Sequence, residues 1–283
     1  MKPAWLNKKI NLKASSRMRR FLRDSGVETV CEQALCPNIG ECSERREATF
    51  LILGRQCTRG CLFCNIEKGK PVLPDPDEPV RVAEAAAMLS LRHVVITSVT
   101  RDDLDDGGAR IFAETVLLVR RKLPRSAIEI LIPDFKLSLT SLAAVADSRP
   151  DIIAHNMETV PSLYPAVRRG ADYTRSLGVL RELKRISPGF KTKSGIMLGM
   201  GEKPEEVYSV MRDLREAGCD FLSIGQYLAP SRRHYPVKEY ATPGQFADYK
   251  TAGEKLGFAH VESAPYVRSS YFAAEYLRQP GKG

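Results

Sequence analysis

The chain has 283 residues, of which 43% are hydrophobic and 27% charged, and a formal net charge of +9 at pH 7. Its length allows one large hydrophobic core, and its composition excludes a disordered or fibrous protein. No segment approaches the ~20 consecutive apolar residues of a membrane-spanning helix, and the basic start lacks the apolar run of an export signal. We expect a cytoplasmic protein without membrane attachment. Its charge favours an acidic partner, either nucleic acid or an acidic carrier protein, although a basic surface without a dedicated partner fits equally well.

Short β-branched segments alternate with longer helical patterns along most of the chain. Strands are predicted at 48–54, 93–99, 128–132, 151–155, 195–200, 221–227 and 259–262. Helices are predicted between them at 81–89, 109–123, 139–146, 173–186, 204–217 and 245–256. Pro204 followed by Glu205 and Glu206 is typical of a helix start, because proline lacks an N–H and acids favour the positive end of the helix dipole.

The repeated strand–helix units predict parallel strands joined by right-handed crossovers. About six units, with polar motifs at the strand ends, indicate an α/β fold: a partial (β/α)6 TIM-type barrel with its site at the C-terminal strand ends. No GxGxxG follows the first strand, which argues against a dinucleotide-binding fold. We predict an N-terminal cysteine-rich extension (1–47), the barrel (48–262) and a C-terminal extension (263–283).

Six of the seven cysteines lie between Cys31 and Cys64. In a chain without an export signal, this grouping indicates metal binding rather than disulfides. Cys57, Cys61 and Cys64 form C-x3-C-x2-C directly after the first predicted strand. Three thiolates can hold three irons of a [4Fe–4S] cubane and leave the fourth iron open, whereas structural zinc normally needs four closed ligands. The spacing resembles the signature of the radical S-adenosylmethionine (SAM) superfamily, in which SAM occupies the open iron and yields a radical that removes hydrogen from unactivated carbon.

Cys31, Cys36 and Cys42 form a second set, C-x4-C-x5-C. One cubane cannot use six thiolates, so the two sets predict two [4Fe–4S] clusters. The second set also lacks a fourth ligand, which a distant residue, a substrate or water must supply.

The segments CEQALCPNIGEC (31–42), CTRGCLFC (57–64) and SAPYVRSSY (263–271) resemble the motifs of lipoyl synthases. The resemblance implies that the N-terminal set holds an auxiliary cluster that is consumed as the sulfur source. It also implies that a serine of the RSSY motif is the fourth ligand: Ser270, with Ser269 as the neighbouring alternative. A hydroxyl is a harder and more easily displaced iron ligand than a thiolate. Without the resemblance, both serines would be interpreted as a capped turn.

The resemblance to lipoyl and biotin synthases also assigns SAM contacts. Asn156 and Glu158 would bind the ribose, because residues two apart on a strand face the same side. Arg175 would face the methionine carboxylate or the substrate, and Thr97 and Ser98 would lie near the SAM amino group. Each of these polar strand ends could instead anchor a loop.

Three further features have structural interpretations. His155 is interpreted as a hydrogen-bonded core residue, and Cys219 as a buried small hydrophobe. The acidic run from Asp102 to Asp106 is interpreted as a cap for the following helix.

The implied reaction inserts sulfur at C6 and C8 of a protein-bound octanoyl-lysine and uses two SAM molecules. The implied partners are an octanoylated lipoyl carrier domain or the glycine cleavage H protein, an electron donor such as ferredoxin or flavodoxin, and iron–sulfur cluster carrier proteins. One rival is another radical SAM sulfurtransferase, similar to biotin synthase. The other is a zinc-containing nucleic-acid-binding protein, which the incomplete ligand sets and the 7% aromatic content fit poorly.

Overall fold

The structure, a computed structural model, describes residues 2–7, 16, 18, 20–22, 24–34, 36, 38–271 and 273–277. The predicted extensions 1–47 and 263–283 are therefore described only in part. None of the helices within these residues is long and apolar enough to cross a membrane.

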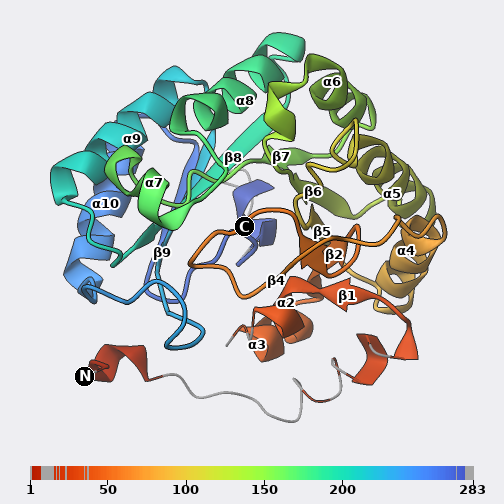
Figure 1. The fold of residues 1–283 in the computed structure, drawn as a ribbon, viewed down its shortest axis with the longest axis horizontal. Coiled ribbons are helices and arrows are strands. Elements are labelled where there is room, and N and C mark those ends of the chain that lie inside the picture. Colours follow the sequence, from red (N-terminus) through yellow and green to blue (C-terminus); the bar gives the residue numbers. More distant parts are fainter. Residues whose placement is uncertain are drawn as a thin grey trace.

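A curved eight-stranded sheet forms the centre of the molecule (Figure 1). The strands lie in the order β1 (Glu28–Thr29), β2 (Glu47–Ile52), β5 (His93–Ser98), β6 (Ala127–Leu131), β7 (Ile152–Ala154), β8 (Lys191–Leu198), β9 (Phe221–Gln226) and β10 (His260–Ser263). β1 is antiparallel to β2, and every other neighbouring pair is parallel. β1 and β10 end the order without pairing with each other, so the predicted partial α/β barrel is confirmed.

One long helix fills each parallel crossover and covers the outside of the sheet (Figure 1). These helices are α4 (Glu78–Met88), α5 (Ala109–Lys122), α6 (Leu139–Asp147), α8 (Tyr173–Ile186), α9 (Pro204–Glu216) and α10 (Pro243–Lys255), and the short α7 (Tyr164–Val167) precedes α8. α9 begins at Pro204 and α8 spans the predicted residues. The six predicted helices are thus present, with ends that differ by at most three residues.

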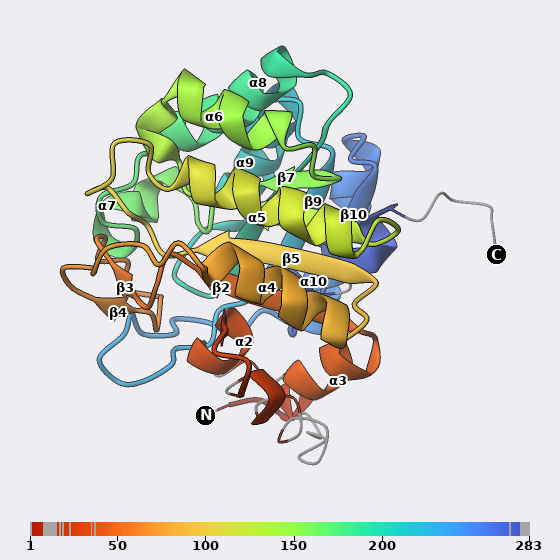
Figure 2. The same cartoon turned by 90° about the vertical axis from the view of Figure 1, so that its right-hand side faces the viewer.

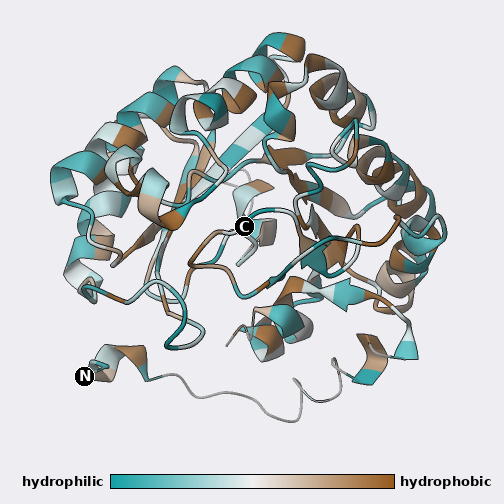
Figure 3. Cartoon of the chain, viewed as in Figure 1, coloured by the Kyte–Doolittle hydropathy of each residue, from teal (hydrophilic) through white to brown (hydrophobic). Residues whose placement is uncertain are grey.

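The core lies on both sides of the strands. β2 and β9 are buried along their whole length, since helices cover one face and the barrel interior the other. In Figure 3 the hydrophobic colour is strong on β5 and β6, whereas hydrophobic and hydrophilic residues alternate along the helices.

Several short elements had no counterpart in the predictions. They are α2 (Val30–Gln33), α3 (Ile39–Glu44), the strand pair β3 (Gln56–Cys57) and β4 (Glu67–Lys68), and the 3-10 turns η1 (Ala4–Leu6), η2 (Phe135–Leu137), η3 (Pro161–Leu163) and η4 (Ala273–Leu277). Elements of two to six residues are too short to show a period, and tertiary contacts must hold them.

The largest error concerns β8, which begins at Lys191 rather than at the predicted residue 195. A lysine in the sequence argues against a buried strand, yet the side chain of Lys193 is fully buried. Its Nζ lies 3.1 Å from Glu129 on β6 and 3.7 Å from the ring centre of Tyr276 in η4. A buried lysine is tolerated only with such partners, and only the fold reveals them.

The C-terminal segment occupies the middle of the arc of strands, where η4 is seen in blue in Figure 1. Tyr276 packs there against Phe221 and His260, at the starts of β9 and β10. The opposite end of the barrel carries β3, β4 and α7, which lie together in Figure 2.

Candidate active site

The loop after β2 carries the first cysteine motif and is tied to three other segments. The N–H of Thr58 donates to the carbonyl of Thr100, just beyond β5, over 3.0 Å. The N–H of Leu62 donates to Val167 over 2.8 Å, and its carbonyl accepts from Tyr235 over 2.9 Å. These bonds hold the loop at the end where the parallel strands terminate, as predicted for the site of such a barrel.

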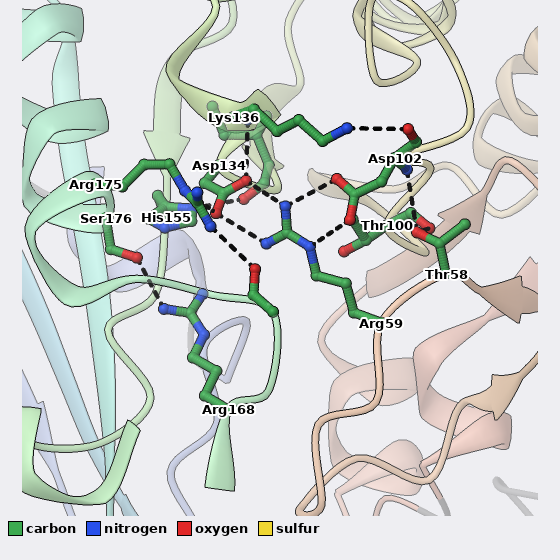
Figure 4. Close-up of polar contacts among 12 residues, drawn as sticks. Thr58, Arg59, Thr100, Asp102, Asp134, Lys136, His155, Arg168, Arg175 and Ser176 are labelled. Carbon is green, nitrogen blue, oxygen red and sulfur yellow. Dashed lines mark hydrogen bonds and ion pairs between the residues drawn. The ribbon is translucent and has the colours of Figure 1, made fainter. Parts of the chain in front are cut away.

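Arg59 lies inside this loop between two carboxylates (Figure 4). Its guanidinium donates to Asp102 at 2.7 and 2.9 Å and to Asp134 at 2.7 and 2.8 Å. Asp134 is fully buried and also accepts from Arg175 Nε at 2.8 Å. Burial alone would raise the pKa of Asp134, but the hydrogen bonds and charge of Arg59 hold it well below its usual range. This ion-pair network fixes the loop between its first two cysteines.

Two sulfurs of the first motif, those of Cys61 and Cys64, are unfavourable as free thiolates. Burial raises the pKa of Cys61, which the charge of Arg168 opposes, and raises the pKa of Cys64 to about 12. The neighbouring Cys57 adds to both rises. Because thiolates are the form that binds iron, a bound cation would offset this cost.

The second motif lines one pocket together with Ser270. Cys31 lies in α2, Cys36 follows that helix, and Cys42 lies in α3. The other lining residues are Asn38, Glu47, Ala48, Thr49, Val95, Arg268 and Tyr271. Burial raises the pKa of Cys31 to about 12 and raises that of Cys42, with the neighbouring cysteines adding to both rises. The pocket therefore brings the three thiols together with the hydroxyl groups of Thr49, Ser270 and Tyr271.

The two serines of the RSSY motif face different sides. Ser270 accepts a hydrogen bond from Thr49 Oγ1 over 2.7 Å at the cysteine pocket. Ser269 accepts one from Asn156 Nδ2 over 2.6 Å. The sequence left the choice between the serines open, and in the structure Ser270 is the one that lines the pocket.

Neither cysteine set has the geometry of a single-ion site. Within the described ranges, no three His, Cys, Asp or Glu side chains are grouped to hold one metal ion. Zinc requires its sulfur ligands at about 2.3 Å from one centre, whereas each thiolate of a cubane binds its own iron.

Asn156 and Glu158 lie side by side just beyond β7. Asn156 Nδ2 donates to Glu158 over 3.0 Å. Glu158 has a φ of +65°, which is costly for a residue with a side chain and is typical of functional sites. Burial raises the pKa of Glu158, against the charge of Arg168 and the Asn156 hydrogen bond. The predicted pair is thus brought together, although by a strained turn rather than by a strand.

The two predicted residues at the end of β5 differ in what they offer. The hydroxyl of Thr97 donates to the carbonyl of Leu131 over 2.8 Å and is used within the sheet. The hydroxyl of Ser98 is buried and has no hydrogen-bond partner among the residues that the structure describes. Ser98 is therefore the one with a hydroxyl available to a ligand.

Sequence reasoning selected Arg175 and missed Arg168. Besides its bond to Asp134, Arg175 donates to the carbonyl of Gly170 over 3.0 Å, so its guanidinium braces the loops. Arg168 is buried and donates to Tyr164 Oη at 2.7 Å. It also donates to Ser176 Oγ at 3.0 Å (Figure 4). The motif recognised in the sequence began at Gly170, and the available signal was the arginine pair directly before it.

Four buried polar atoms that follow the ends of β5 and β7 have no partner in the described part of the chain: Ser98 Oγ, His155 Nε2, Asn156 Oδ1 and Thr159 Oγ1. His155 Nδ1 donates to the carbonyl of Ile132 over 2.9 Å, and burial together with the charge of Arg168 lowers the pKa of His155 to about 4. The imidazole is therefore neutral at pH 7, which agrees with its interpretation as a hydrogen-bonded core residue. Buried polar atoms are normally satisfied, so this group fits a ligand that brings hydroxyl and amino groups, as SAM does.

The other structural interpretations are confirmed where the structure tests them. Asp106 accepts from the N–H groups of Gly108 and Arg110 at the start of α5, at 2.9 and 3.0 Å. Asp102 is not part of this cap, since it pairs with Arg59. Cys219 is fully buried.

Comparison with known proteins identifies the family. A sequence profile of the Radical SAM superfamily matches residues 51–214. The lipoyl synthase of Geobacter sulfurreducens (strain ATCC 51573 / DSM 12127 / PCA) is 58% identical over 275 residues, which cover 97% of this chain and 90% of that protein. The lipoyl synthase of Geobacter sp. (strain M21) is 56% identical over 276 residues, covering 98% and 94%. This chain belongs to the lipoyl synthases.

The fold of this lipoyl synthase is shared more widely. The FeFe-hydrogenase maturase HydG from Carboxydothermus hydrogenoformans has a TM-score of 0.59 at 13% identity, over 91% of this chain and 73% of that one. At this identity the likeness shows the radical SAM fold alone. The superfamily match begins in β2 and ends in α9, so it includes the first cysteine motif and excludes the second motif and the RSSY segment.

As a lipoyl synthase, the chain is a radical SAM sulfurtransferase that uses [4Fe–4S] clusters and SAM. It acts on lipoyl carrier substrates. The two cysteine sets and the unpaired polar atoms of the barrel end fit these groups.

Proposed function

We propose that this lipoyl synthase inserts two sulfur atoms, at C6 and C8, into an octanoyl-lysine group on a carrier protein. In this proposal the SAM-binding cluster is held by Cys57, Cys61 and Cys64. The auxiliary cluster, which donates sulfur, is held by Cys31, Cys36, Cys42 and Ser270.

The observation that carries the proposal is the shared pocket of the second cysteine set and Ser270. Ser270 contacts Thr49, which is 221 residues away in the chain, and the cysteines of this pocket come from the N-terminal segment. A zinc site would close with a fourth cysteine or histidine. A serine in that position supports a cluster that must later be opened, because a hydroxyl is displaced from iron more easily than a thiolate.

The chemistry that the clusters and SAM supply is the removal of hydrogen from unactivated carbon and the delivery of sulfur. The protein binds and orients these groups. Asn156 and Glu158 offer hydrogen bonds to the ribose. Ser98 offers a hydrogen bond to the amino group, and Arg168 offers a buried positive charge to the methionine carboxylate. Thr97 and Arg175 stabilise the site without contacting SAM. The hydroxyl of Thr97 is used in a hydrogen bond within the sheet, and the guanidinium of Arg175 is used in the ion-pair network that holds the cysteine loop.

The proposed partners follow from charge and from the reaction. The net charge of +9 favours an acidic carrier, either an octanoylated lipoyl domain or the glycine cleavage H protein. Each turnover needs electrons, from a donor such as ferredoxin or flavodoxin, and a rebuilt cluster, from iron–sulfur carrier proteins. The free cysteines of both sets fit a reducing cytoplasm.

The decisive experiment is anaerobic incubation of reconstituted protein with SAM, a low-potential reductant and an octanoylated carrier peptide. We expect mass analysis to show two added sulfur atoms, and a parallel sample with free octanoate to show none. Sulfur added to the free acid alone would favour the rival that is similar to biotin synthase. A colourless protein that binds zinc and no iron would favour the nucleic-acid-binding rival.

Replacing Cys36 with alanine separates the two clusters. We expect Cys36→Ala to hold about four irons instead of about eight. It should still cleave SAM to 5′-deoxyadenosine, because the first motif is intact, while sulfur insertion falls below detection. Iron analysis, SAM cleavage and product mass test this together, and loss of SAM cleavage in a folded variant that retains the first cluster would contradict the separate roles.

A further inference from the structure

The segment SAPYVRSSY (263–271), which is called the RSSY segment here, runs against the inner face of the sheet. The N–H of Gln226 donates to the carbonyl of Pro265 over 3.2 Å, and a side chain at Gly225 would lie 2.1 Å from the carbonyl oxygen of Val267. The close approach therefore depends on glycine in β9. It brings the segment between the two proposed cluster sites.

Adjacent serines in this segment reach the two sites separately. Ser270 contacts Thr49 at the cysteine pocket, and Ser269 contacts Asn156 beside Glu158. Ser269 and Ser270 are the two central residues of a turn, which the N–H of Tyr271 closes by donating to the carbonyl of Arg268 over 2.9 Å, and their side chains leave this turn toward different partners. Asn156 is thus connected to the auxiliary pocket by its hydrogen bond to Ser269 and by the peptide bond that joins Ser269 to Ser270.

In the side chain of Asn156, both N–H groups of the amide donate hydrogen bonds, whereas its oxygen accepts none from the described residues. Nδ2 donates to Ser269 at 2.6 Å and to Glu158 at 3.0 Å. Oδ1 is buried and has no hydrogen-bond partner in the part of the chain that the structure describes. Oδ1 lies 2.9 Å from where a Cβ at Gly195 would be, so glycine leaves room beside it. An open buried acceptor of this kind suits a hydroxyl donor such as a ribose O–H.

We propose that Ser269 is a positioning residue that couples SAM binding to the hold of Ser270 on the auxiliary cluster. A ribose hydroxyl donating to Asn156 Oδ1 would fix the amide plane and strengthen the opposite N–H bond to Ser269. Ser269 would then hold the segment, and with it Ser270, in the cysteine pocket. The inference rests on the proposed function, since it takes Asn156 as a SAM contact and Ser270 as a cluster ligand.

Coupling between the two sites should appear in two measurements, one made at each site. The first is the rate at which bathophenanthroline disulfonate removes iron from the reconstituted two-cluster enzyme, with and without SAM and with no reductant present. Iron release from the two clusters should show separate kinetic phases. The phase that is absent in a Cys31→Ala/Cys36→Ala/Cys42→Ala variant is the one that belongs to the auxiliary cluster. The second is the Kd of SAM under the same conditions.

In the parent enzyme we expect SAM to slow iron loss from the auxiliary cluster about fivefold or more. Ser269→Thr keeps the hydroxyl and should keep this effect. Ser269→Val has the shape of threonine without the hydroxyl. It should lose the SAM effect on iron loss, and its Kd for SAM should rise. The difference between these two variants isolates the hydrogen bond from packing.

Ser263→Ala is the matched control. Ser263 Oγ donates to the carbonyl of Phe246 over 2.7 Å, in the same part of the chain but outside both sites. This variant should retain the SAM effect. Equal SAM effects in Ser269→Val and the parent would overturn the inference while sulfur insertion by the parent still stood. A parent enzyme that inserts no sulfur would instead overturn the proposed function.

Discussion

At the scale of residues, buried charges in pairs decide the geometry of the site. Asp134 and Arg59 fasten the first cysteine loop, and Lys193 and Glu129 lie fully buried across β8 and β6. Removing one member of such a pair leaves an uncompensated charge, which costs more than the pair itself contributes. These residues are therefore tightly constrained although none is a proposed cluster ligand.

Asp134→Asn should destabilise the protein by about 3 kcal/mol, because Arg59 and Arg175 lose a buried partner. Denaturant unfolding of the cluster-free protein measures this. Glu182→Gln is the control, since Glu182 pairs with Arg185 on the exposed face of α8 and should cost about 0.5 kcal/mol. A cost as small for Asp134→Asn as for the control would show that the network is not structural.

The same pair has a defined pH dependence. The pKa of Asp134 lies below its ordinary value, so the carboxylate stabilises the fold at every pH above the ordinary aspartate pKa of about 4. This contribution is lost as the pH falls from there toward the lowered pKa. The stability difference between parent and Asp134→Asn should therefore be constant near neutral pH and shrink only in strong acid. A difference that shrinks between about pH 7 and 5 would contradict this assignment.

At the scale of elements, long helices and hydrophobic strands follow from local pattern, whereas the short elements follow from contacts. α8 spans its predicted residues because its apolar positions recur at helical spacing and Asp172 caps its start. α2 and α3, which carry Cys31 and Cys42, have four and six residues and no readable period. The segments that carry the second cysteine set are thus among those that local pattern does not predict.

Gly225→Ala tests the fit of the C-terminal segment against β9. Its Cβ would lie 2.1 Å from the carbonyl oxygen of Val267, so the segment must move and Ser270 with it. We expect the first cluster to remain and the auxiliary iron to be lost, giving about four irons per chain. Gly244→Ala, whose nearest neighbour would be Thr242 Oγ1 at 3.8 Å, should keep about eight. Full iron content in Gly225→Ala would show that the segment does not depend on this contact.

At the scale of the whole molecule, the basic charge acts on encounter with the carrier. Raising the ionic strength from about 0.05 to about 0.5 M should increase the KM for an acidic octanoylated carrier several-fold, because screening weakens long-range attraction. The KM for a neutral octanoyl-lysine peptide should change little, and kcat should be the same with both. An equal salt dependence for carrier and peptide would show that net charge does not direct carrier binding.

The sequence alone determined the repeated strand–helix order, the two cysteine sets and the chemistry they imply. These properties are local, since periodicity and ligand spacing are written within short stretches of chain. Only the tertiary structure decided that Ser270 and not Ser269 lines the cysteine pocket, that Arg168 lies beside the first cysteine loop, and that Lys193 is buried. Each of these depends on a partner distant in the chain, and side-chain pattern carries no information about which distant segments meet.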